Sequence, residues 1–231
     1  MTKTRLCLLP STILAATALA FLGSGAAHAG TTTTFKPTAA NLKHFVLAQS
    51  DLPDGYKREG RMNSRSPGGC VDLAGDPAAT RSYERKLRAL GFRGCASASF
   101  SREVETEIDE ELTRTATNEP GSEAILMRDR QAAARALPVL RRTLLQSYTA
   151  AAAGVPVEAH SIPTEGLGSA APRGIQLTYD LGELFGKLTT SMYVWRRGPV
   201  VGWVFSSHVL GDFDDARTLE LARTLDSRIA G

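Results

Sequence analysis

Apolar residues recur at helical spacing in three stretches of the chain, near residues 79–90, 130–153 and 213–229. Spacings of three and four residues put such side chains on one face of a helix. The sequence therefore predicts three amphipathic helices. Their apolar stripes consist of Tyr83, Leu87 and Leu90 in the first stretch, Leu137, Leu140, Leu144 and Tyr148 in the second, and Ala216, Leu219, Ala222, Leu225 and Ile229 in the third.

A period of two residues predicts strands elsewhere, at residues 92–104 and at 123–129 after a turn expected at 118–121. The stretches 60–77 and 154–174 are rich in glycine and proline and show no period, so we expect loops there.

The clearest strand pattern is the pair KLTTSMYVWRR and VVGWVFSS, joined by Gly-Pro. It predicts a β-hairpin over residues 186–207. With Arg197 and Gly198 as the turn, Met192 faces Trp203 on one apolar side. Tyr193 and Trp195 then lie on the other side.

Together these elements predict an α+β fold. We expect a twisted antiparallel sheet that is packed on one face by two or three helices, with the C-terminal helix following the hairpin.

The first thirty residues predict a secretory signal peptide. Lys3 and Arg5 precede an apolar run, which ends in small residues up to Ala29. We expect cleavage there, and therefore a secreted chain in the extracellular or cell-envelope space. The expected organisation is a cleaved segment 1–29, a flexible Thr-rich segment 30–41 and a single domain 42–231.

Charge and hydropathy narrow the range of partners. Loss of Lys3 and Arg5 lowers the formal net charge from +3 to +1, which gives no electrostatic argument for nucleic acid. No later segment is apolar enough to span a bilayer, so we expect no stable membrane anchor.

The second predicted helix has a basic side formed by Arg135, Arg141 and Arg142. Anion binding is one interpretation of this side. A solvated helix face that faces the acidic stretch 103–112 is the commoner explanation.

Two cysteines, Cys70 and Cys95, remain after cleavage. In an oxidising compartment, two cysteines without a third competitor most simply form one disulfide. The mature histidines are too scattered to complete a zinc site with them. A redox or metal role is the alternative.

Motifs for catalysis, metals and cofactors are not found in the sequence. The acidic stretch 103–112 lacks the turn glycine and spacing of a calcium loop, and the aspartates at 212–215 suit the N-terminus of a helix. There is no G-x-S-x-G in the mature chain, no H-E-x-x-H and no phosphate-binding glycine loop. We expect no metal and no cofactor. A catalytic set assembled in space escapes such a search, so a secreted hydrolase stays open.

Three segments, SDLPDGY, VWRRGPVVGWVFSS and LELARTLDSRIAG, resemble exported actinobacterial domains of unknown function. These are similar to the extracellular sensor domain of mycobacterial serine/threonine kinases. The resemblance implies an antiparallel sheet packed against helices and binding of something outside the cell. Such sensor domains usually have two disulfides and an attached kinase, whereas this chain has one expected disulfide and no kinase.

We therefore expect a secreted, non-enzymatic binding or sensor-like module for an envelope component, a small apolar ligand or a protein partner, with a hydrolase as the alternative. If the outer side of the hairpin is uncovered, Tyr193 and Trp195 are the candidate binding residues, because aromatic side chains carry much of the binding energy of interfaces. The alternative is that both rings belong to the core.

Overall fold

The computed structural model describes residues 36–64, 77–107, 113–151, 154–168, 172–182, 186–208 and 215–230. In chain order, with η for a 3-10 helix, the elements are η1 (Leu42–His44), η2 (Gln49–Asp51), β1 (Lys57–Ser64), α1 (Pro77–Ala89), β2 (Phe92–Glu107), β3 (Thr113–Met127), α2 (Arg130–Ala151), β4 (Val157–Ile162), β5 (Arg173–Asp180), β6 (Lys187–Arg197), β7 (Val200–His208) and α3 (Asp215–Ala230). The expected signal peptide and its cleavage site lie outside the described residues, so they stay predictions.

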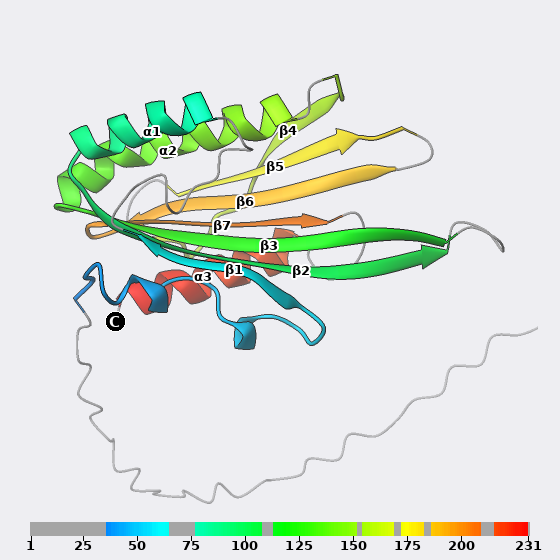
Figure 1. The fold of residues 1–231 in the computed structure, drawn as a ribbon, viewed down its shortest axis with the longest axis horizontal. Helices are drawn as coiled ribbons and strands as arrows, with labels where there is room; N and C mark the ends of the chain where they lie inside the picture. The colour runs from blue at the N-terminus through cyan, green and yellow to red at the C-terminus, as the bar shows by residue number, and fades with distance from the viewer. Residues whose placement is uncertain are drawn as a thin grey trace, which may run out of the picture. The chain divides into compact units, whose positions relative to one another are not determined.

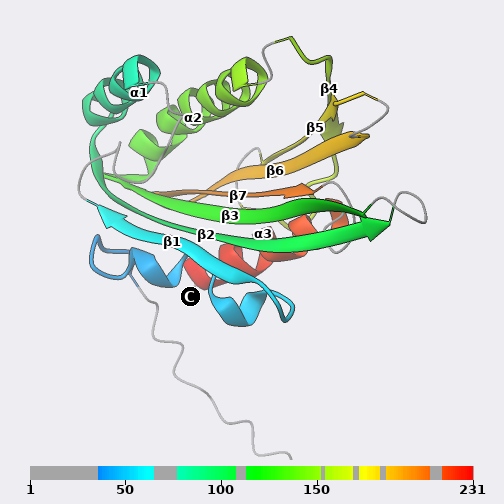
Figure 2. The ribbon, with the colours of Figure 1, turned by 45° about the vertical axis from the view of Figure 1, so that its right-hand side comes forward.

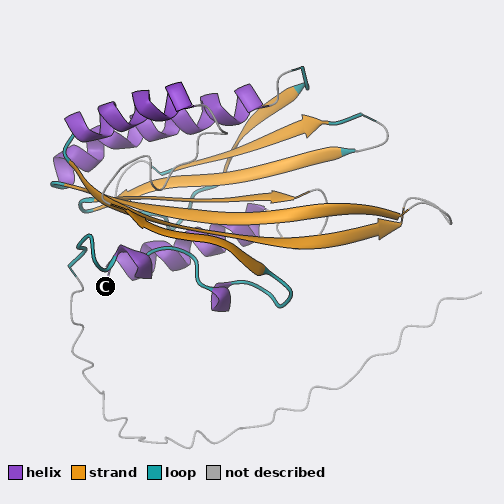
Figure 3. Ribbon diagram, viewed as in Figure 1, coloured by secondary structure: helices purple, strands orange, loops and turns teal. Residues whose placement is uncertain are grey.

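The seven strands form one antiparallel sheet in the order β1-β2-β3-β7-β6-β5-β4 (Figure 1). Helices α1 and α2 cover one face of this sheet, and α3 with the 3-10 helices covers the other (Figure 2). The sheet is thus the middle of three layers (Figure 3). This confirms the predicted α+β class, with two helices on one face and a C-terminal helix after the hairpin.

The three helices do not all lie on one face of the sheet, because α3 packs on the face opposite to α1 and α2. Leu219, Leu225 and Ile229 of α3 belong to the same core as Phe100 and Val204. The core beneath α1 and α2 is a separate cluster. An apolar stripe predicts that a helix packs, but it does not say on which side of a sheet it packs.

The hairpin exists as predicted, but its register is shifted by two residues. Met192 pairs with Phe205, and Arg197 pairs with Val200. Gly198 and the proline after it therefore form the turn, in place of the pair expected from the sequence. A shift of two residues leaves every side chain on its predicted face, because side chains alternate along a strand with a period of two.

The turn expected at 118–121 is wrong, because β3 runs straight through it. Pro120 and Gly121 lie inside the strand, opposite Ser206 and Phe205 of β7. A Cβ atom at position 121 would lie 2.3 Å from the Phe205 ring. The glycine therefore marks a place where a ring packs directly on the backbone.

Three strands occupy parts of the expected loops. β1 takes residues 60–64, β4 lies within 154–174, and β5 begins at Arg173. β1 and β4 are the two edge strands of the sheet, and the four central residues of β4 are exposed. An exposed edge strand needs no apolar alternation, so its sequence resembles a loop. Across the described part of the chain, no helix has the length and hydropathy needed to cross a membrane.

Candidate functional site

Tyr193 and Trp195, the candidate binding residues of the hairpin, are core residues. Both are 0% exposed. They lie on the face of β6 that α3 covers, in one cluster with Leu221 and Leu225 of that helix. The binding hypothesis requires an uncovered hairpin face, and that condition is not met.

Specific contacts hold the two rings in place. The Tyr193 hydroxyl donates a hydrogen bond of 3.1 Å to the backbone oxygen of Asp215 at the start of α3. The Trp195 ring lies over Gly202 of β7, where a Cβ atom would come within 2.7 Å of it. Sequence alternation places these rings on one side of the hairpin, but only the position of α3 decides that this side is buried.

The proposed disulfide is described at one end only. Cys95 lies in β2 and is 0% exposed, in the core beneath α1 and α2. Cys70 lies outside the described residues, so the bond between the two cysteines stays a prediction.

The layer formed by α1 and α2 is strongly basic. Residues 77–93 and 128–151 contain ten arginine and lysine residues but only two acidic ones, Glu84 and Asp129. Nine of the ten basic residues are exposed, and Arg141 is half-buried. We call this surface the α1–α2 face. Its basic residues are Arg81, Arg85, Lys86, Arg88, Arg93, Arg128, Arg130, Arg135, Arg141 and Arg142.

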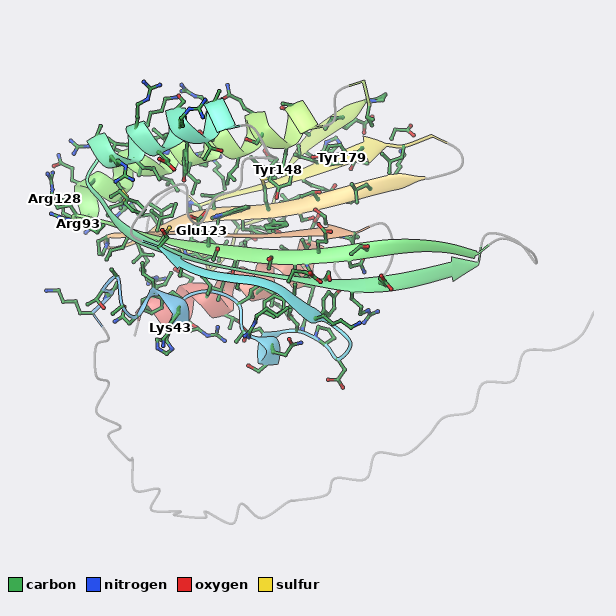
Figure 4. All side chains as sticks on the ribbon, viewed as in Figure 1. Lys43, Arg93, Glu123, Arg128, Tyr148 and Tyr179 are labelled. Atoms are coloured by element: carbon green, nitrogen blue, oxygen red, sulfur yellow. The ribbon has the colours of Figure 1, made fainter. Side chains whose placement is uncertain are left out.

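A backbone hydrogen bond joins the segment after α1 to the segment before α2 at one end of the sheet. The backbone N–H of Arg128 donates a hydrogen bond of 2.7 Å to the oxygen of Gly91, just after α1. Asp129 caps the start of α2, because its carboxylate accepts a hydrogen bond of 2.7 Å from the N–H of Ala132. Arg93 and Arg128 lie together at this end of the sheet (Figure 4).

The acidic stretch 103–112 lies mostly outside the part of the chain whose side chains are described. Glu103 is the one acidic residue of that stretch whose side chain is described, and no ion pair joins it to Arg135, Arg141 or Arg142. An ion pair on the α1–α2 face joins Arg128 to the adjacent Asp129. That the basic side of α2 faces the acidic stretch therefore stays a prediction.

Arg141 lies where the α1–α2 face meets the sheet. Its Nε atom is buried and has no hydrogen-bond partner among the described residues. Burial lowers the pKa of Arg141, and the like charge of Arg173 at the start of β5 lowers it further. Two arginines of separate elements thus approach each other across the helix–sheet boundary.

A buried carboxyl group lies beneath the same helices. Glu123 of β3 is 1% exposed, and burial raises its pKa to about 8. The indole N–H of Trp203 donates to one carboxyl oxygen, while the other oxygen has no partner among the described residues. Figure 4 shows Glu123 between the sheet and the helical layer. Its burial makes it a core group rather than a surface site. No group of three or more potential metal ligands occurs in the described ranges.

Comparisons with known proteins give a weak structural likeness. No family model matches the sequence, and no curated protein matches it. Among solved structures, the extracellular domain of PknH from Mycobacterium tuberculosis has a TM-score of 0.49 and 9% sequence identity, covering 84% of this chain and 95% of that one. It is an extracellular mycobacterial domain, as is the class of domains that the sequence resembles. A likeness of this strength carries no argument about binding, and the resemblance to other exported actinobacterial domains stays a prediction.

Proposed function

We propose that the chain is a secreted, non-enzymatic binding module whose α1–α2 face binds the surface of anionic phospholipids in the cell envelope. Of the three kinds of ligand that the sequence left open, the charge of this face favours an envelope component. The observation that carries the proposal is the charge of two neighbouring helical segments, which contain ten basic residues and only two acidic ones.

The energetics suit reversible binding without an anchor. Each arginine or lysine close to an anionic bilayer contributes about 1 kcal/mol. One side of a helix pair brings only part of the nine exposed cations to a flat surface at once. Four or five of them would contribute about 4–5 kcal/mol, which gives weak binding that salt reverses.

Sedimentation with lipid vesicles tests the proposal. We expect the mature chain to bind vesicles that contain phosphatidylglycerol at low salt and to dissociate from them at high salt. It should not bind vesicles of pure phosphatidylcholine. The triple variant Arg81→Gln, Arg135→Gln and Arg142→Gln should weaken binding by about tenfold or more.

A matched control removes the same charge elsewhere. The triple variant Lys36→Gln, Lys43→Gln and Lys57→Gln changes three exposed residues outside the α1–α2 face. Lys43, for example, lies on the far side of the sheet from α1 and α2 (Figure 4). Equal loss of binding in both triple variants would mean that net charge, and not this face, binds the vesicles. Tighter binding to a DNA duplex than to vesicles would contradict the lipid assignment.

A further inference from the structure

Arg196 of β6 is an unusual core residue, because it is a cation that is only 5% exposed. It pairs with Val201 of β7, so both side chains lie on the sheet face beneath α1 and α2. Its one described hydrogen bond runs from Nη1 to the oxygen of Gly198 at 3.5 Å. A guanidinium group carries five N–H donors, so most donors of this group have no acceptor among the described residues.

Arg173 lies next to Arg196 on the same face of the sheet. It pairs with Val194 across β5 and β6, and Arg196 follows two residues later on β6. Residues related in this diagonal way have Cα atoms about 7–8 Å apart, within the reach of arginine side chains. Arg173 is exposed, so this corner of the face is open to solvent.

Arg141 approaches the same corner from α2. Its charge interacts with that of Arg173, and its buried Nε lacks an acceptor among the described residues. In the same ranges, none of the three arginines has a carboxylate partner. Like charges repel, and a buried cation without a counter-charge is costly. An anion bound among the three would relieve both costs.

We propose that Arg141, Arg173 and Arg196 form a binding site for one phosphate group. Guanidinium groups bind phosphate oxygens through paired N–H donors, and α2, β5 and β6 each supply one such group. The site lies at the inner edge of the α1–α2 face. The inference deepens and rests on the proposed function, since the phosphate would be that of a lipid headgroup.

The first test uses inorganic phosphate as the probe. Titration calorimetry on the mature chain, at constant ionic strength made up with chloride, measures its dissociation constant. Arg141→Gln and Arg173→Gln should each weaken phosphate binding by about tenfold or more, because each removes charge-assisted hydrogen bonds. Lys57→Gln is the matched control, since it removes one positive charge from an exposed position of β1 outside the α1–α2 face and should change the constant by less than about twofold.

Arg196 needs a separate design because a change at this buried position can unfold the chain. Arg196→Lys keeps the charge and loses the paired donors, and circular dichroism checks that the variant folds. Thermal unfolding gives a second measurement that does not depend on Arg196. Replacing chloride by phosphate should raise the unfolding midpoint of the wild type and leave that of Arg141→Gln almost unchanged. An equal rise in both proteins would count against the site.

The outcomes separate the site from the wider function. Phosphate binding that Arg141→Gln weakens and Lys57→Gln spares supports the site. Vesicle binding without phosphate binding, or equal effects of the two variants, overturns the site and leaves the proposed function standing. Phosphate binding without vesicle binding keeps the site and overturns the lipid assignment, with free phosphate as the ligand.

Discussion

Glu123 and Trp203 face each other directly across β3 and β7, and the indole N–H donates a hydrogen bond of 2.6 Å to the buried carboxyl group. This bond favours the charged carboxylate, but desolvation outweighs it, so the pKa of Glu123 rises from 4.5 to about 8. The Tyr83 hydroxyl of α1 is buried, and its pKa rises through burial and then through the charge of Glu123. The fold therefore favours a protonated Glu123 at neutral pH.

The free energy of unfolding should depend on pH through Glu123. Between pH 4.5 and about 8 the folded chain keeps this proton and the unfolded chain loses it. The contribution of Glu123 to the free energy of unfolding is therefore fully present below pH 4.5. It falls as the pH rises, by about 1.4 kcal/mol per pH unit. The total loss of unfolding free energy would be about 4–5 kcal/mol once the pH reaches the pKa of Glu123 in the folded chain.

Urea unfolding at a series of pH values measures this dependence. Glu123→Gln keeps an acceptor for the indole N–H and cannot ionise, so its profile should be flatter by that amount over the same range. Identical slopes for the variant and the wild type would show that Glu123 does not titrate in this way.

The sequence predicted those parts of the fold that residues close together in the chain determine. The stripes of α1, α2 and α3 and the alternation of the hairpin depend on neighbours within a few residues, so these elements were predicted. The turn at 118–121 was wrong because the packing of Phe205 on Gly121, contributed by a strand far along the chain, sets the backbone there.

The candidate site could be predicted only in part. Arg135, Arg141 and Arg142 form one basic helix side in the sequence, but net charge gave no sign that α1 adds its own cations to the same surface. Arg173 lay at the edge of the loop expected at 154–174. Arg196 lay at the end of a predicted strand, and nothing in the local sequence marked either arginine as a binding residue. Their convergence depends on the strand register and on the position of α2, which short-range patterns do not contain.

The buried carboxylate of Asp226 should matter more to stability than an exposed one on the same helix. It accepts hydrogen bonds from Arg197 and from the N–H of Gly168, and so connects α3 to β6 and to the loop before β5. Asp226→Asn should cost about 2–4 kcal/mol, because it weakens charge-assisted bonds in a buried place.

Glu220→Gln is the matched control for that change. It breaks the exposed pair between Arg217 and Glu220, and such surface pairs contribute about 0.2–1 kcal/mol. Urea unfolding of both variants measures the difference. Equal losses of stability would contradict a special role for the carboxylate of Asp226.

Gly202 and Trp195 should be energetically coupled. A Cβ atom at position 202 would lie 2.7 Å from the six-membered part of the indole, so Gly202→Ala should destabilise the fold by about 1–3 kcal/mol. The Trp195→Phe variant has a smaller ring without the outer indole atoms, so adding Gly202→Ala to that background should cost less. A double-mutant cycle of unfolding free energies measures this coupling, and additive effects would show that the two positions do not collide.

The disulfide prediction concerns a loop and a core strand. Cys95 is buried in β2, so a bond to Cys70 would fasten the segment before α1 to the sheet beneath that helix. In the chain-entropy description, closing a loop of this length contributes about 3.5 kcal/mol. Mass spectrometry of the chain purified from culture medium should show a mature protein that begins at residue 30 and gains two hydrogens on reduction. The Cys70→Ser variant should lower the unfolding midpoint, whereas a reduction that changes neither mass nor stability would show that the two thiols are free.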